Sequence, residues 1–304
     1  MSASDLQAAA LSPRPCALTF GQLMSMRFGQ EPFVVSQGLI PVGGLVFIGG
    51  PPKTYKTFTL FTTAVQLAIG HNLFSTVVRK ARITSPRFIV NRPYKVLLIE
   101  QEMTNADIQE RLEPINAILT PEERRLCNTN LIIQARDTQL RLDDWTTANG
   151  AMYELLTAHR PEILMLDPLV EFHSQDENSA QHMGRIMREL SIMRERFALK
   201  ALEVAHHSSK PGRDEFAGRV GPDGLRGSSV MFGKGDSYIM LSHAKTPGIV
   251  DVSFTIRRSK PLPGMRLQLD ELTGLMNFKE WHKGGKRSHA GRPSTDSEND
   301  DPDV

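Results

Sequence analysis

Lys56 and Thr57 are the residues whose types and spacing point most directly to chemistry. They follow a turn rich in glycine and proline, which itself follows a short apolar run. From Gly50 onward the sequence fits the phosphate-loop pattern G-x-x-x-x-G-K-[ST], except at Tyr55. In such a loop, backbone N–H groups and a helix N-terminus converge on a phosphate, the lysine reaches the β- and γ-phosphates, and the hydroxyl ligates Mg²⁺. We therefore predict binding of ATP with Mg²⁺ by Gly50, Pro51, Pro52, Lys53, Thr54, Tyr55, Lys56, Thr57 and Phe58.

Tyr55 stands where the pattern has glycine. Glycine adopts left-handed backbone angles freely, whereas another residue adopts them at a cost of roughly 1 kcal/mol or more. This departure leaves a second interpretation open. The segment would then be a glycine-rich turn between a core strand and a core helix, with Lys56 merely exposed to solvent.

Acidic residues follow two apolar runs that are typical of buried strands. The runs are 96–99, followed by Glu100 and Glu102, and 163–166, followed by Asp167. Ligands of open α/β sheets collect at the carboxyl ends of the strands, so both groups of acids are expected near the phosphate loop. A carboxylate of the first group would polarise the water that attacks a γ-phosphate, and Asp167 would hold a Mg²⁺-bound water. Alternatively, the first group caps a helix that begins near Asn105.

The elements that must position these residues alternate between strands and helices. Strands are predicted over 45–48, 96–99, 131–134, 163–166, 201–205, 237–241, 250–256, 266–269 and 275–278, and helices after the phosphate loop and over 105–119, 143–159 and 181–197. In the last helix Met183, Met187, Leu190 and Met193 have the spacing of a core face, and an exposed loop is expected over 172–180. The pattern predicts an α/β fold with a mostly parallel sheet flanked by helices, and antiparallel strands added at the C-terminal side.

Composition narrows the class of protein. The 304 residues carry a formal charge of +2, which does not by itself argue for nucleic acid. Cys16 and Cys127 lie far apart and suit a reducing, cytoplasmic setting. No apolar run approaches the roughly 20 residues that cross a bilayer, and no signal peptide is apparent. We expect an N-terminal arm with a short helix over 1–34, one domain over 35–282 and a disordered, basic-then-acidic tail over 283–304.

Two segments concentrate basic residues. Between 71 and 95 the chain has six lysines and arginines and no acidic residue, so a β-ribbon facing a phosphate backbone and ordinary solvated surface are both open. The polar, glycine-rich segment 208–227 contains Lys210, Arg213, Arg219 and Arg226 and is a candidate DNA-binding loop.

Taken together, these segments resemble the RecA-like ATPases, and most closely the branch of plasmid RepA-type hexameric replicative helicases. The resemblance rests on GGPPKTYKT at 49–57, VLLIEQEM at 96–103, ILMLDPL at 163–169, VAHHSSK at 204–210 and LRGSSVMFGKGDSYIML at 225–241. It covers residues 35–280 and implies one α/β domain, six-membered rings and ATP bound between subunits. It also implies that the bulky residue at Tyr55 preserves nucleotide binding and places turnover in question.

The same resemblance assigns roles to individual residues. Lys56 and Thr57 bind the phosphates and Mg²⁺, Asp167 is the magnesium-side aspartate, and Glu102 is the catalytic carboxylate, with Glu100 as second choice.

His207, or else His206, takes the position of a γ-phosphate sensor linked to the DNA loop; a histidine satisfying strand-end hydrogen bonds is the alternative. Arg226 falls where a neighbouring subunit inserts an arginine finger, with Arg258 and Lys260 as competitors and a purely structural role also open.

We therefore expect a Mg²⁺-ATP-dependent motor that forms a homo-oligomeric ring and moves on single-stranded DNA in plasmid or phage replication, with replication partners possible and no membrane association. The rival is a nucleotide-gated DNA-binding or loading protein with little or no hydrolysis. A phosphotransferase that shares the loop is a third option.

Overall fold

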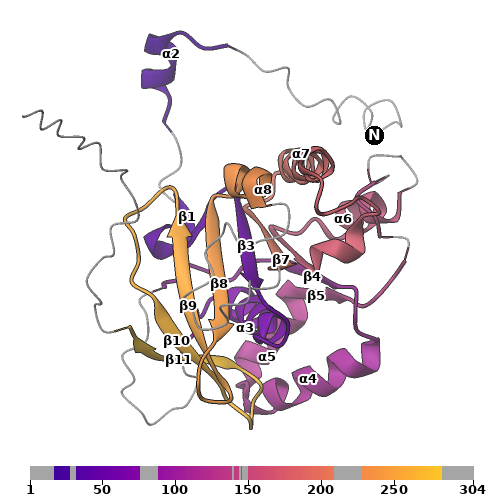
Figure 1. Ribbon diagram of the computed structural model, residues 1–304, viewed down its shortest axis with the longest axis vertical. Helices are drawn as coiled ribbons and strands as arrows, with labels where there is room; N and C mark the ends of the chain where they lie inside the picture. Colours follow the sequence, from indigo (N-terminus) through magenta and orange to yellow (C-terminus); the bar gives the residue numbers. More distant parts are fainter. Residues whose placement is uncertain are drawn as a thin grey trace, which may run out of the picture.

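The computed structural model describes residues 17–27, 32–75, 88–138, 140–143, 145, 150–208 and 228–282. Within them, a nine-stranded sheet runs through the molecule in the order β11-β10-β9-β8-β3-β7-β6-β4-β5 (Figure 1). Its strands are β3 (Gly44–Gly50), β4 (Val96–Glu100), β5 (Leu131–Gln134), β6 (Ile163–Asp167), β7 (Ala201–His207), β8 (Ser237–His243), β9 (Ile249–Ile256), β10 (Met265–Leu269) and β11 (Met276–Trp281). A separate small pair joins β1 (Phe33–Val35) to β2 (Ile40–Pro41).

The sheet divides into a parallel part and an antiparallel part. Strands β8, β3, β7, β6, β4 and β5 are parallel to one another, whereas β9, β10 and β11 are added to β8 as antiparallel neighbours. This arrangement confirms the predicted α/β class, including the antiparallel strands at the C-terminal side. The parallel strands share one carboxyl edge, at which the phosphate-loop turn and the ends of β4, β6 and β7 meet.

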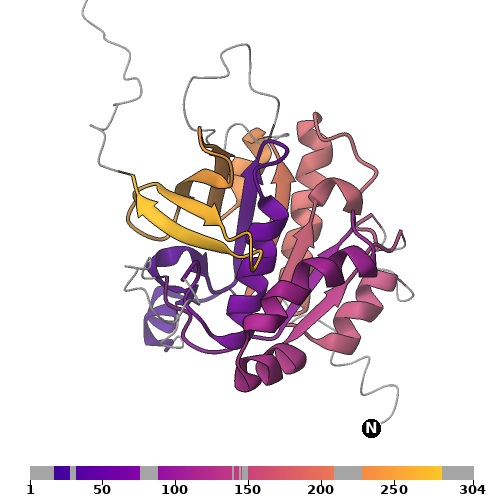
Figure 2. The same ribbon diagram turned by 90° about the horizontal axis from the view of Figure 1, so that it is seen from below.

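Helices cover both faces of the sheet. They are α3 (Lys56–Ile69), α4 (Asn105–Ile118), α5 (Pro121–Asn130), α6 (Ala151–His159), α7 (Ala180–Arg196) and α8 (Ser228–Lys234). A further short helix, α2 (Phe20–Ser25), has no buried residue and lies apart from the sheet (Figure 1). In the described residues α3, α4 and α5 lie on one side and α6, α7 and α8 on the other, as Figures 1 and 2 show. Helices α4 and α5 each begin with a capping box, at Thr104 and Thr120.

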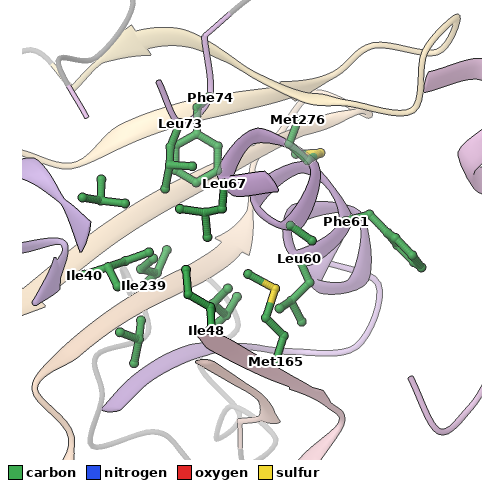
Figure 3. Close-up of a cluster of buried hydrophobic side chains, with 14 of the residues drawn as sticks. Ile40, Ile48, Leu60, Phe61, Leu67, Leu73, Phe74, Met165, Ile239 and Met276 are labelled. Atoms are coloured by element: carbon green, nitrogen blue, oxygen red, sulfur yellow. The ribbon is translucent and has the colours of Figure 1, made fainter. Parts of the chain in front are cut away.

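Alternation along the strands separates two apolar cores. Val46 and Ile48 of β3 join the core under α3, whereas Leu45 and Phe47 join the core under α6 and α7. Figure 3 shows part of the first core. The labelled side chains there include Leu60 and Leu67 of α3, Ile48 of β3, Met165 of β6 and Ile239 of β8. Strand β3 is buried on both faces, so it holds the phosphate-loop turn rigidly.

Two sequence predictions need correction, and two helices, α5 and α8, were not predicted. The helix expected over 143–159 begins only at Ala151: the Asp143 carboxylate accepts hydrogen bonds from Ser174, and the buried Trp145 donates its Nε1–H to Glu189 of α7. The loop over 172–180, expected to be exposed, buries Phe172, His173 and Glu177. Helix α8 was not predicted, because it is short and contains Gly233; the Tyr238 hydroxyl holds its end by donating to backbone carbonyls.

The predicted core face of α7 is confirmed, since Met183, Met187, Leu190 and Met193 are all buried. The basic segment 76–87, most of the candidate DNA-binding loop (209–227) and the tail lie outside the described residues. In the part that is described, no helix has the length and apolar character needed to span a bilayer.

Candidate nucleotide-binding site

The turn between β3 and α3 has the close backbone approaches of a phosphate loop. A Cβ atom at Gly50 would lie 2.5 Å from the Leu241 carbonyl oxygen and 2.8 Å from Oγ1 of Thr54. Thr54 also donates its hydroxyl to the Pro51 carbonyl at 2.8 Å, which folds the turn on itself. Only glycine fits at position 50, because any side chain there would collide with the Leu241 carbonyl group and with Thr54.

Tyr55 adopts the backbone conformation for which the motif normally uses glycine. Its angles are φ 60° and ψ 30°, in the left-handed region, and Lys53 is also left-handed with φ 63°. The Tyr55 carbonyl still accepts the first hydrogen bonds of α3 from Thr59, and its ring contacts Phe58 edge-on at 6.0 Å between centroids. The loop therefore keeps its shape despite the tyrosine, with a strain of about 1–2 kcal/mol.

Lys56 lies inside the turn and not in solvent. Its Nζ donates to the carbonyl oxygens of Gly50 at 3.1 Å and Pro51 at 2.9 Å, and the side chain is buried. Burial lowers the pKa of Lys56, while the negative charges of Asp167 and Glu102 act in the opposite direction. The alternative that left Lys56 merely exposed to solvent is thus wrong on this point, because the ammonium group is enclosed by the carbonyl groups of the turn.

Asp167 ends β6 directly beside the start of α3. The Thr57 hydroxyl donates a hydrogen bond to its carboxylate, and burial raises the pKa of Asp167 to about 6 against the opposing effect of that bond. Its second oxygen, Oδ2, is buried and has no hydrogen-bond partner among the described residues. A hydroxyl and an unpartnered carboxylate oxygen side by side fit Mg²⁺, which protein sites commonly hold through one or two carboxylates, waters and substrate phosphates. The described residues contain no cluster of three or more histidine, cysteine, aspartate or glutamate side chains that could hold a metal ion.

Glu100 and Glu102 have different environments. Glu100 is opposite Asp167 in the β4–β6 register and is buried, and its carboxyl group accepts the backbone N–H groups of Glu102 and Met103. Burial, followed by the charge of Asp167, raises the pKa of Glu100 to about 7. Glu102 is exposed, and its charge acts on both Lys56 and Asp167. The geometry therefore leaves Glu102 available to a water molecule, whereas Glu100 shapes the backbone of the strand end.

The two histidines at the end of β7 lie next to the phosphate loop. In the parallel register His206 is opposite Gly49 and His207 is opposite Gly50. Successive strand residues face opposite sides, so His207 shares the α3 face, whereas His206 faces the α7 side. There the buried His206 has its Nδ1 3.6 Å from Oε1 of Glu177. Of the two histidines, His207 is thus the one on the α3 face of the sheet.

Among the candidate arginine fingers, Arg258 makes contacts that lie away from the phosphate loop. Arg226 lies outside the described residues. Arg258 binds Asp236 at 2.9 Å, and Asp236 in turn bonds the backbone of Leu45 at the opposite end of β3 from the loop. Lys260 is exposed and follows it.

Arg111 of α4 is a residue at this site that the sequence patterns did not single out. Its guanidinium carbon lies 4.6 Å from the centre of the Phe58 ring, and its charge is among those that lower the pKa of Asp167. In the sequence, only its position in the helix that begins at Asn105, shortly after Glu102, could have indicated this location.

Comparisons with known proteins agree with this geometry. The family described as AAA domain matches residues 12–213 of the 304. Among solved structures, the ATPase domain of a phage helicase is similar, with a TM-score of 0.55 and 16% sequence identity over 83% of this chain and 94% of that one. A search of curated proteins finds no match. The chain therefore belongs to the AAA domain family, with the fold of a RecA-like P-loop ATPase.

Proposed function

We propose that the protein is a Mg²⁺-dependent ATPase motor that assembles as a ring, most simply a hexamer, and translocates on single-stranded DNA during plasmid or phage replication. The observation that carries the proposal is the meeting of three charged groups at one strand edge: the enclosed Lys56, the buried Asp167 bonded to Thr57, and the exposed Glu102. The helicase-like resemblance of the sequence and the similarity to the phage helicase ATPase domain support the motor part of the proposal.

Positioning and electrostatics carry the chemistry in this proposal. Lys56, whose side chain is buried, would exchange its two carbonyl partners for the β- and γ-phosphates and gain charge-assisted contacts. Thr57 and Asp167 would hold Mg²⁺, which neutralises charge on the transferred phosphoryl group. Glu102 would orient the attacking water and accept its proton. Burial of Lys56 and Asp167 matters here because low polarity strengthens the interactions of these two groups.

Coupling to DNA is proposed to run through β7. His207 ends this strand beside Gly50, and the candidate DNA-binding loop continues directly from it. A group that contacts the terminal phosphate there would change its bonding when ATP is hydrolysed. The neighbouring subunit would complete the site with a trans arginine, Arg226 first and Arg258 or Lys260 as competitors, which is why a ring is proposed and not a monomer.

A second candidate function has one observation in its favour. Tyr55 places a bulky side chain at the left-handed position of the loop, and this strain favours a protein that binds nucleotide but turns it over slowly. In that case nucleotide would gate DNA binding or loading without continuous movement.

Phosphate release from ATP, measured with and without single-stranded DNA, separates the two functions. Several-fold stimulation by DNA supports the motor, whereas near-zero turnover combined with nucleotide-dependent DNA binding supports the gated binder.

Lys56→Ala is the matched inactive control and is expected to abolish turnover while circular dichroism stays unchanged. Unaltered hydrolysis in this variant would dismiss the motor, and unaltered nucleotide-dependent DNA binding would dismiss the gated binder. Light scattering with and without Mg²⁺ and ATP measures ring assembly.

A further inference from the structure

Arg111 lies beside the phosphate loop, where its guanidinium group contacts the ring of Phe58. It lies in the second turn of α4, and its guanidinium group stacks over Phe58, the residue directly after Thr57, at 4.6 Å from the ring centre. Cation–π stacking fixes the guanidinium plane while leaving its N–H edges free.

Two further parts of the protein pack against Arg111 and Phe58. The Tyr55 ring meets Phe58 edge-on, and the turn between β10 and β11 closes over it: a Cβ atom at Gly274 would lie 3.7 Å from the Arg111 carbonyl oxygen and 3.8 Å from Cε1 of Phe58. The aromatic platform under Arg111 is therefore held in place by the loop, by α4 and by the C-terminal hairpin. A guanidinium on such a platform is pre-organised, so little rotamer entropy remains to be lost on binding.

The guanidinium group itself has no hydrogen bond or ion pair among the described residues, although two carboxylates are near enough to interact with it electrostatically. These are Asp107, one turn earlier on α4, where it caps the helix, and the buried Asp167. Five donors without an acceptor, fixed beside the loop, are suited to an anion with several oxygens.

We propose that Arg111 contacts the terminal phosphate of ATP from within the same subunit and thereby lets the site distinguish ATP from ADP. This inference rests on the proposed nucleotide site and adds to it a cis cation besides Lys56. The competing possibility is that Arg111 only fastens α4 to Phe58. The two differ in their consequences, because a fastener affects ATP and ADP alike, whereas a contact to the terminal phosphate affects only the triphosphate.

Arg111→Met is the informative variant, since methionine keeps an unbranched apolar stem against Phe58 and removes the charge. Isothermal titration of the full chain with Mg²⁺-ATPγS and Mg²⁺-ADP gives both affinities. We expect the triphosphate to bind at least about tenfold more weakly and ADP to stay within about twofold, the range for losing one charged hydrogen-bonding group. Arg125→Met, which removes an exposed arginine paired with Glu122 on α5, is the matched control and should change neither affinity.

Arg111→Lys tests the same point if the methionine variant does not fold. Its compact ammonium cannot make a forked contact, so a smaller but still triphosphate-selective loss is expected. Equal losses for both nucleotides, or no loss, in a folded variant would overturn the assignment of Arg111. Failure of the unaltered protein to bind either nucleotide would instead refute the proposed function, on which the assignment depends.

Discussion

Glu203 offers a quantitative test of the architecture, because it is a carboxylic acid in the apolar interior of the sheet. It lies in the middle of β7, between Val46 of β3 and Met165 of β6, and is fully buried. Within the part of the chain that the structure describes, neither carboxyl oxygen has a hydrogen-bond partner, and burial raises the pKa of Glu203 from 4.5 to about 8. The group is therefore protonated in the folded protein at neutral pH and ionised in the unfolded chain.

This difference sets the size and sign of the effect. Because the pKa of Glu203 is higher in the folded protein than in the unfolded chain, the group destabilises the folded protein at high pH. This free-energy cost is absent below pH 4.5 and grows until the pH reaches about 8. At pH 7 the interval above 4.5, at about 1.4 kcal/mol per pH unit, gives a cost of about 3 kcal/mol. Glu203→Met removes the titrating group and fills a similar volume, so it should raise the free energy of unfolding by about that amount at pH 7.

Urea denaturation of both proteins between pH 5 and pH 8 measures the prediction. The stability gain of Glu203→Met should shrink by up to about 1.4 kcal/mol for each unit that the pH is lowered. Near pH 5 a smaller gain should remain, because methionine buries no polar carboxyl group. Glu203→Gln, which cannot ionise, should show the same altered pH dependence without the full gain. A stability difference that is constant across this range would refute the claim that Glu203 is buried and protonated.

Three further predictions concern the nucleotide site. Glu102→Gln should lower ATP turnover by about 100-fold or more with ATP affinity retained, because the water loses its base; turnover equal to the unaltered protein in a phosphate-release assay would shift the role elsewhere. Asp167→Asn should weaken the Mg²⁺-dependent part of nucleotide binding by about tenfold or more, measured with a fluorescent nucleotide with and without Mg²⁺, since the unpartnered carboxylate oxygen is lost; an unchanged Mg²⁺ dependence would remove Asp167 from the metal site. Tyr55→Gly should be more stable than Tyr55→Ala by about 1 kcal/mol in urea denaturation, because both lose the ring but only glycine relieves the left-handed strain; equal stabilities would mean that the backbone at position 55 is not left-handed.

Much of the fold was readable from local patterns. Apolar runs bounded by polar turns located the strands of the parallel sheet, because a strand buried on both faces is almost continuously apolar. The phosphate-loop motif located the turn before α3 and even the position of strain at Tyr55, since the motif encodes a backbone conformation. By contrast, the start of α6 was misplaced because Trp145 is held by a distant residue of α7, a contact that periodicity does not contain.

The sequence by itself determined which residues carry charge or a hydroxyl at the ends of strands, and so the kind of chemistry available. The tertiary structure decided which of them meet. Pairing of β4 with β6 buries Glu100 against Asp167 and leaves Glu102 outside. The register of β7 with β3 places His207 opposite Gly50, and alternation along the strand puts it on the α3 face, opposite to that of His206. Arg111 enters the site only because α4 packs against Phe58. The physical reason is that burial, register and charge proximity are properties of segments distant in the chain, which no local pattern specifies.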